Sequence, residues 1–219
     1  MLSHVISSST PSYGNRDNIE VIVKSSIEKG DTANTSSWIF SNNHIGTHID
    51  VPQHFSNRGL KTYEIPISDY VFNKVELVDI PCVNGRLINI QDFRNVRKID
   101  SEVELLLIRT GFENFRKERK YWNDNPGLSP ELANYFREKY TKLRCVGFDF
   151  ISLTSWNFRE EGRLSHVEFL TPLEPHKPIL IIEDMKLNSI YSKVNSVIVS
   201  PLFVEDGNGG AATIFANIN

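Results

Sequence analysis

Continuous apolar runs, more than alternating ones, dominate the pattern of hydrophobic and polar positions along the chain. The clearest are Leu105-Leu106-Leu107-Ile108 and Ile179-Leu180-Ile181-Ile182. Runs this short and this apolar are typical of strands that are covered on both faces of a sheet. From these runs, from β-branched stretches and from one alternating stretch at 19–24, we predict strands over 19–24, 71–80, 104–110, 144–150, 178–183, 194–200 and 211–216.

A helical pattern begins at Ser129, which can cap a helix whose first position suits Pro130. Apolar residues then recur at helical spacing as far as Tyr140, so one face of this helix should pack in the core. Shorter helices are predicted near 90–96 and 113–122. Strands that alternate with helices predict an α/β fold, a single domain over 1–219 with a central mixed β-sheet flanked by helices.

Composition narrows the class of protein. The net charge of the 219-residue chain is −3 and no basic block occurs, which argues against a nucleic-acid partner. No apolar run approaches the ~18 residues of a membrane span, and the first residues lack a signal-peptide pattern. Cys82 and Cys145 each sit beside an apolar run, so we expect buried free thiols and a cytoplasmic location.

The densest group of metal-binding side chains lies in the eleven residues 44–54, His-Ile-Gly-Thr-His-Ile-Asp-Val-Pro-Gln-His. This stretch holds three of the six histidines of the chain and an aspartate. Imidazole and carboxylate groups together are ligands for zinc, manganese or non-haem iron. An exposed polar loop is the ordinary interpretation of a lone histidine, but a cluster of this density favours a metal site.

The spacing of these ligands predicts a bend. A regular strand would hold His44 and Asp50 roughly 20 Å apart, too far for one ion. A helix would be broken by Pro52. We therefore predict a strand end that runs into a tight turn, with Gly46 supplying an unusual backbone angle and Pro52 a fixed one.

Two later positions are further candidates for metal ligands. His166 lies in a polar stretch, and Glu183 ends the apolar run 179–182. A carboxylate at the end of a buried strand is costly unless it is paired or bound to a metal. From the residues alone, a structural role and a ligand role are equally open for each.

On the motif His-x-Gly-Thr-His-x-Asp-x-Pro-x-His, the chain resembles the cyclase-like metal-dependent hydrolases, the family of bacterial kynurenine formamidase and isatin hydrolase. Other segments resemble that family in the same order: Leu2-Ser3-His4, Tyr121-Trp122, Pro126-Gly127-Leu128-Ser129, Val146-Gly147-x-Asp149-x-x-Ser152 and Pro178–Glu183. The resemblance covers nearly the whole chain. It implies an α/β domain with a central sheet, assembled as a homodimer or homotetramer.

The resemblance also implies a divalent metal, Zn²⁺ or Mn²⁺, as one or two ions. A first ion would be held by His44, His48 and Asp50. A second would be held by His166, with Asp50 and Glu183 bridging the two. Compared with the formamidases, this chain has extra residues between His166 and Glu183, and they include a rival ligand, His176.

His54 would be the catalytic acid and base in this family. Its place beyond Pro52 suits a residue that faces the metal from the pocket wall. A role as a fourth ligand is the alternative, and we favour the role in proton transfer.

Two further departures concern the substrate pocket. The formamidases have an aromatic-Pro-Gly-Asp stretch near the N-terminus that packs on substrate, where this chain has Pro11-Ser12-Tyr13-Gly14-Asn15. Tyr13 is therefore the candidate substrate-binding residue. Trp156 stands where an aspartate is common. Both departures predict a pocket that differs from that of a kynurenine formamidase.

We expect a metal-dependent hydrolase that cleaves a C–N bond of a small amide or cyclic amide. A bound ion lowers the pKa of its water from about 15.7 towards ~7, so the water can attack a carbonyl at neutral pH. The alternatives are a cyclase, a dehydratase or a lactone hydrolase on the same site, or a non-catalytic metal-binding protein. Arg109, Arg159 and Arg163 could bind a substrate carboxylate, although arginines are more often surface residues.

Overall fold

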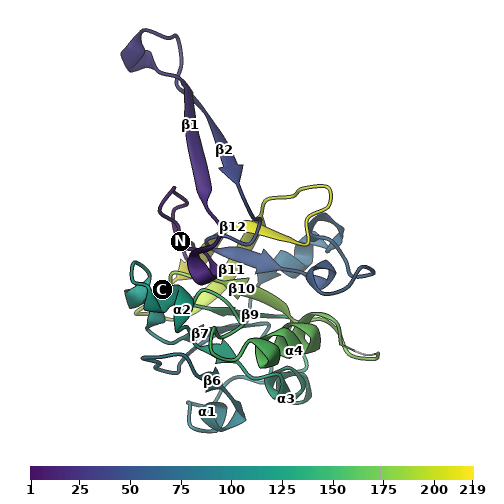
Figure 1. Cartoon of the computed structure of the whole chain (residues 1–219). Helices are drawn as coiled ribbons and strands as arrows, with labels where there is room; N and C mark the ends of the chain where they lie inside the picture. Colours follow the sequence, from purple (N-terminus) through teal and green to yellow (C-terminus); the bar gives the residue numbers. More distant parts are fainter. Residues whose placement is uncertain (173) are drawn as a thin grey trace.

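One curved, mixed sheet of eight strands forms the centre of the molecule (Figure 1). The computed structural model describes residues 1–172 and 174–219. The strands of the sheet are β3 (His48–Asp50), β4 (Val71–Phe72), β5 (Val75–Asp79), β7 (Leu105–Arg109), β9 (Cys145–Phe148), β10 (Leu180–Glu183), β11 (Val194–Pro201) and β12 (Gly209–Ile218). Their order across the sheet is β4-β11-β12-β3-β10-β9-β7-β5. The predicted α/β fold with a central mixed sheet is confirmed.

The apolar runs form the parallel half of the sheet, in which β5, β7, β9 and β10 pair in parallel. Successive residues of β7 alternate between two cores. Leu106 and Ile108 pack on the helical side, whereas Leu105 and Leu107 pack against β11 and β12 residues such as Val197. This alternation explains why every position of the run is apolar.

The predicted strand over 71–80 is divided into β4 and β5. The backbone N–H groups of Asn73 and Lys74 donate to the Glu104 carboxylate at 2.7 and 3.2 Å, which fixes a turn between the two strands. β4 then pairs with β11 at one end of the sheet, and β5 pairs with β7 at the other. Because β5 also approaches β11, the sheet curls nearly into a barrel.

The helices are α1 (Ile90–Arg94), α2 (Lys120–Asn123), α3 (Glu131–Lys139) and α4 (Arg159–Leu170). The helix predicted from Ser129 is confirmed as α3, but Ser129 does not cap it. Instead, the backbone N–H of Ser129 donates to Ile88 O. This bond continues a small parallel pair of strands, β6 (Leu87–Ile88) and β8 (Gly127–Leu128). The helix predicted over 113–122 is interrupted and gives a 3₁₀ turn at Phe112–Phe115 followed by α2. No described helix is both long and apolar enough to cross a bilayer.

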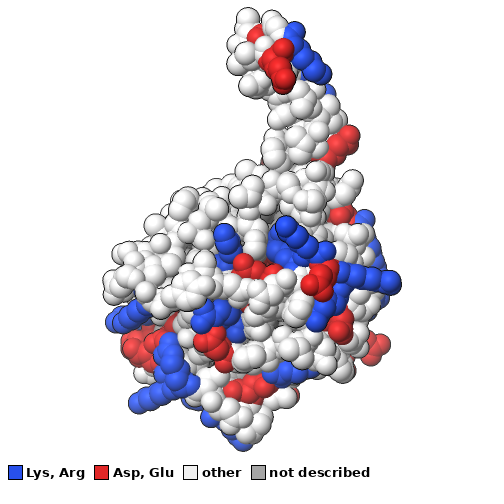
Figure 2. Space-filling model, turned by 90° about the vertical axis from the view of Figure 1, so that its left-hand side faces the viewer, with Lys and Arg blue, Asp and Glu red and all other residues white. Residues whose placement is uncertain are grey.

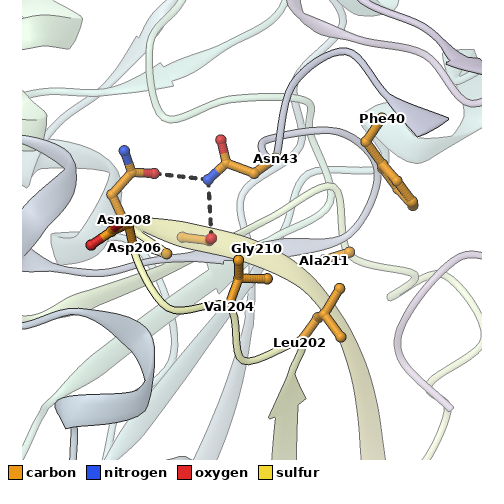
Figure 3. A pocket seen from close by; sticks show the side chains of 10 residues that line it. Phe40, Asn43, Leu202, Val204, Asp206, Asn208, Gly210 and Ala211 are labelled. Carbon is orange, nitrogen blue, oxygen red and sulfur yellow. Dashed lines mark hydrogen bonds between the residues drawn. The ribbon is translucent and has the colours of Figure 1, made fainter.

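An antiparallel ribbon of two strands, β1 (Ile19–Ser25) and β2 (Thr35–Phe40), stands away from the body as an arm (Figure 1). Its shaft carries few charged side chains on the face seen in Figure 2, and charges gather at its tip. A pocket lies at the root of the arm, where Phe40 faces Leu202 and Val204 (Figure 3). β2 leads from this pocket directly into the segment that begins at His44.

Candidate metal centre

The segment 44–54 bends as its spacing predicted. Gly46 has a positive φ of 73°, which a residue with a side chain rarely adopts. β3 follows, and a 3₁₀ turn over Pro52–His54 begins with the fixed φ of its proline. The bend folds His44 back over β3, whose residues are buried.

His44, His48 and Asp50 meet at one point, with candidate ligand atoms within 4.8 Å of one another. His44 Nδ1 lies 2.7 Å from Asp50 Oδ1. Its Nε2 lies 2.9 Å from the Asn208 side-chain oxygen and can donate to it. Both ring nitrogens of His44 therefore face oxygen acceptors, and a cation could replace a proton between Nδ1 and the carboxylate.

His166 and Glu183 reach the same place from two other elements. Glu183 ends β10, where it pairs in register with His48 of β3. His166 comes from α4, and its Nε2 lies 3.6 Å from Asp50 Oδ2 and 3.5 Å from Glu183 Oε1. α4 can approach this closely because a Cβ on Gly162 would come within 2.6 Å of Thr154 Cα.

The orientation of two imidazoles suits metal binding. His48 Nδ1 donates to Gly46 O at 2.8 Å, and His166 Nδ1 donates to Gly162 O at 2.9 Å. Each ring therefore presents its Nε2 to the carboxylates. His48 Nε2 is buried and has no hydrogen-bond partner in the described part of the chain. It lies 3.4 Å from both Asp50 Oδ1 and Glu183 Oε2. These atoms are too far apart for good hydrogen bonds and suitably spaced to share an ion.

The pKa values show how strongly the two carboxylates attract positive charge. Burial opposes ionisation of His48, yet Asp50 and then Glu183 raise its pKa to about 9. Against the same cost of burial, Asp50 and Glu183 raise the pKa of His166 to about 10. Despite its burial, Asp50 has a pKa held well below its usual range, chiefly by His44. A divalent ion would compete for this site with the protons that the histidines otherwise hold.

His54 lies at the wall of the pocket that contains these ligands. Its ring stacks on that of His44 with centroids 4.0 Å apart. Burial lowers the pKa of His54 to about 4, against the attraction of Asp50, so the ring is neutral near pH 7 and can accept a proton. A His54 nitrogen also lies within 4.8 Å of ligand atoms of Asp50 and His166, so the geometry allows a ligand role as well.

The other residues that the sequence singled out differ in whether they lie in the pocket with the candidate ligands. Tyr13 lines the metal pocket, and its ring lies 5.2 Å from that of Trp156. His176 is exposed and lines a different surface pocket, away from the candidate ligands. Arg109 is engaged in an ion pair with Asp79 at 2.6 Å. The prediction that Cys82 and Cys145 are buried free thiols is confirmed.

The sequence did not indicate two groups that hold the ligands in place. Asn208 meets His44 from 164 positions away, and Asn43 donates to the same Asn208 oxygen at 2.8 Å (Figure 3). The backbone N–H of Leu153 donates to Glu183 Oε1 at 2.7 Å. Near Asn208, the sequence offers one local signal, the glycine on either side, which marks a turn but does not indicate a contact with His44.

Comparisons with known proteins place this geometry in a family. The family model described as putative cyclase matches residues 1–154, which contain the whole 44–54 motif. The chain is 28% identical to a kynurenine formamidase of Bacillus cereus over 171 residues, 76% of this chain and 72% of the relative.

Two solved structures show the same fold. Isatin hydrolase A from Labrenzia aggregata has a TM-score of 0.76 at 17% identity, over 100% of this chain and 93% of that chain. A predicted metal-dependent hydrolase from Bacillus stearothermophilus has a TM-score of 0.75 at 21% identity, over 98% and 95%. The resemblance drawn from the motif is thus confirmed, and because the family model matches most of its length, this chain belongs to the putative cyclase family.

Proposed function

We propose that this protein is a metal-dependent hydrolase that cleaves a C–N bond of a small amide or cyclic amide. The observation that carries the proposal is the convergence of His48 Nε2 and His166 Nε2 on the carboxylates of Asp50 and Glu183 at 3.4–3.6 Å. The site opens into a pocket that also holds His54, whereas a purely structural metal site is closed by its ligands. The similarity to a kynurenine formamidase and the fold shared with an isatin hydrolase support amide hydrolysis.

A bound divalent ion would supply a Lewis acid for the carbonyl and would lower the pKa of a coordinated water. The residues of the chain do the rest. His48 and His166, fixed by their Nδ1 hydrogen bonds, would hold the ion with unprotonated Nε2 atoms. His54, neutral near pH 7, would take a proton from the attacking water and return it to the leaving nitrogen.

We propose zinc or manganese as the ion, with two ions per chain. His44, His48 and Asp50 would hold the first, and His166 and Glu183 would hold the second. The position of Asp50 supports this assignment, because its Oδ1 faces His44 while its Oδ2 faces His166. Asp50 would therefore help to hold both ions.

We also propose that the protein is a homodimer or homotetramer of the cytoplasm. Buried free thiols support a reducing compartment. The apolar face of the β1–β2 arm supports self-association.

Metal content and product analysis test the proposed function together. Purified protein loaded with zinc or manganese should hold close to two ions per chain, and His48→Ala and Asp50→Ala should lose most of them while circular dichroism stays native. The loaded protein should hydrolyse at least one member of a screen of N-formyl amines, cyclic imides and lactones, with net uptake of water. Well-folded wild type that binds neither metal would refute the site. Ring closure or dehydration without water uptake would refute the hydrolysis.

A further inference from the structure

Arg16, Arg159 and Arg163 line the same pocket as the metal ligands. Within the described ranges, 1–172 and 174–219, none of the three forms an ion pair. Arg109, by contrast, is neutralised by Asp79. Arginines that face a pocket without a carboxylate partner are free to bind an anion from solution.

Trp156 holds two of these arginines in place. The Arg159 guanidinium lies 3.7 Å from the centroid of the indole ring, and that of Arg16 lies 5.2 Å from it. Tyr13 packs on the same indole, with ring centroids 5.2 Å apart. Tyr13 and Trp156, which the sequence analysis singled out as departures in the substrate pocket, are therefore in contact with each other.

α4 fixes the distance between the arginines and the metal centre. Arg163 precedes His166 by three residues and Arg159 precedes it by seven, so the three side chains share one face of the helix. At 1.5 Å per residue, Arg163 lies about 4–5 Å and Arg159 about 10 Å from His166 along the helix axis. An anion bound there would sit a few bonds away from a carbonyl held at the metal centre.

The part of the pocket lined by Arg16, Arg159 and Arg163 has little negative charge to balance them. Among the residues that the structure describes, Asp17 is the one acidic residue that lines the pocket apart from the candidate metal ligands Asp50 and Glu183. It accepts hydrogen bonds from Ser41 and Asn42 at 3.3 and 3.2 Å and pairs with no arginine. Apart from the candidate metal ligands Asp50 and Glu183, the pocket therefore carries three arginines and one carboxylate.

We propose that Arg159 and Arg163 bind a carboxylate of the substrate and that Trp156 positions Arg159 for this contact. The substrate class is then a small amide that carries an acid group a few bonds from the scissile C–N bond. This inference rests on the proposed hydrolysis. Arg159 and Arg163 are specificity residues in this scheme, and Trp156 is a positioning residue.

Two paired measurements on metal-loaded protein test the inference. Calorimetry compares the binding of an aminobenzoate with that of the corresponding neutral aminobenzamide. Kinetics compares a formamidobenzoate with formanilide, which lacks the carboxylate. Wild type should favour the charged member of each pair by at least tenfold, and Arg159→Gln or Arg163→Gln should lower that preference about tenfold, the usual effect of one lost charged hydrogen bond.

Matched variants separate recognition from folding. Arg94→Gln, at an exposed arginine of α1, should leave the preference unchanged. Trp156→Leu should raise KM for the formamidobenzoate alone and leave kcat unchanged, and Trp156→Phe should restore part of the affinity.

The outcomes also distinguish this inference from the proposed function. Equal binding of charged and neutral ligands by wild type would overturn the inference, as would an unchanged preference in fully metal-loaded arginine variants, which would assign the carboxylate to the metal. Hydrolysis of formanilide and formamidobenzoate at equal efficiency would support the proposed hydrolase activity and refute carboxylate binding by Arg159 and Arg163. Carboxylate binding that depends on the arginines, without hydrolysis of any amide, would keep the anion site and refute the proposed hydrolysis.

Discussion

His54 is the residue for which the geometry allows two roles, proton transfer and ion binding. Its ring stacks on His44 at 4.0 Å, and burial keeps it neutral at pH values well below 7. A neutral imidazole at the pocket wall can accept a proton, whereas the Nε2 atoms of His48 and His166 lie 3.4 and 3.5 Å from the Glu183 carboxylate oxygens. We therefore propose that His44, His48 and His166 bind the ion and that His54 transfers protons.

We predict that His54→Ala keeps its metal but lowers kcat by about 10²–10⁴, the usual contribution of acid–base catalysis. Metal content and turnover must be measured on the same preparation. His176→Ala, at an exposed histidine of another pocket, serves as the control and should change neither quantity. Parallel loss of metal and activity in His54→Ala would make His54 a ligand, and full activity would exclude it from the mechanism.

At the scale of elements, the bend of segment 44–54 brings the ligands together, and it depends on Gly46. The φ of Gly46 is +73°, and a Cβ there would lie 3.2 Å from Thr10 Cγ2. Gly30, in the arm, has a comparable φ of +94° with open space around it. The two glycines therefore carry similar backbone strain when substituted, but only one of them shapes the metal site.

We predict that Gly46→Val lowers metal affinity by at least tenfold without removing a ligand, because a β-branched side chain resists this backbone angle. Gly30→Val should lower the free energy of unfolding by about 1–2 kcal/mol and leave metal affinity unchanged. Metal titration and urea unfolding of both variants give the comparison. Wild-type metal affinity in Gly46→Val would show that the bend does not depend on this glycine.

The elements also show which parts of the fold a sequence can predict. Apolar runs such as Leu105–Ile108 identify buried strands because each residue of the run reaches one of two cores. α4 escaped prediction because Arg159–Gly162 is polar and contains a glycine, which allows close contact with Thr154. The candidate ligands within 44–54 are close in sequence and can be identified there, whereas Asn208 is placed by β-sheet topology, which one sequence does not display.

At the scale of the whole molecule, the arm has an apolar face that is exposed beyond its buried root residue Ile19. Cross-strand pairing puts Ile19 opposite Phe40 and Val21 opposite Trp38, and Val23 continues the same face. Val23 is 64% exposed and Trp38 is 50% exposed. Through Phe40, this face continues into the apolar pocket at the root of the arm (Figure 3).

A two-stranded ribbon is marginally stable alone in water, so the arm gains stability by burying this face. We propose that it packs against the arm and root pocket of a second copy, a self-complementary contact that a two-fold axis closes. Sedimentation should show a dimer or larger oligomer for the wild type, and both Trp38→Glu and Leu202→Glu should shift it towards monomer. Ser37→Glu adds the same charge on the opposite face of the arm and should leave the oligomer intact. A wild type that is monomeric at tens of micromolar, or a Trp38→Glu variant that sediments like it, would refute arm exchange.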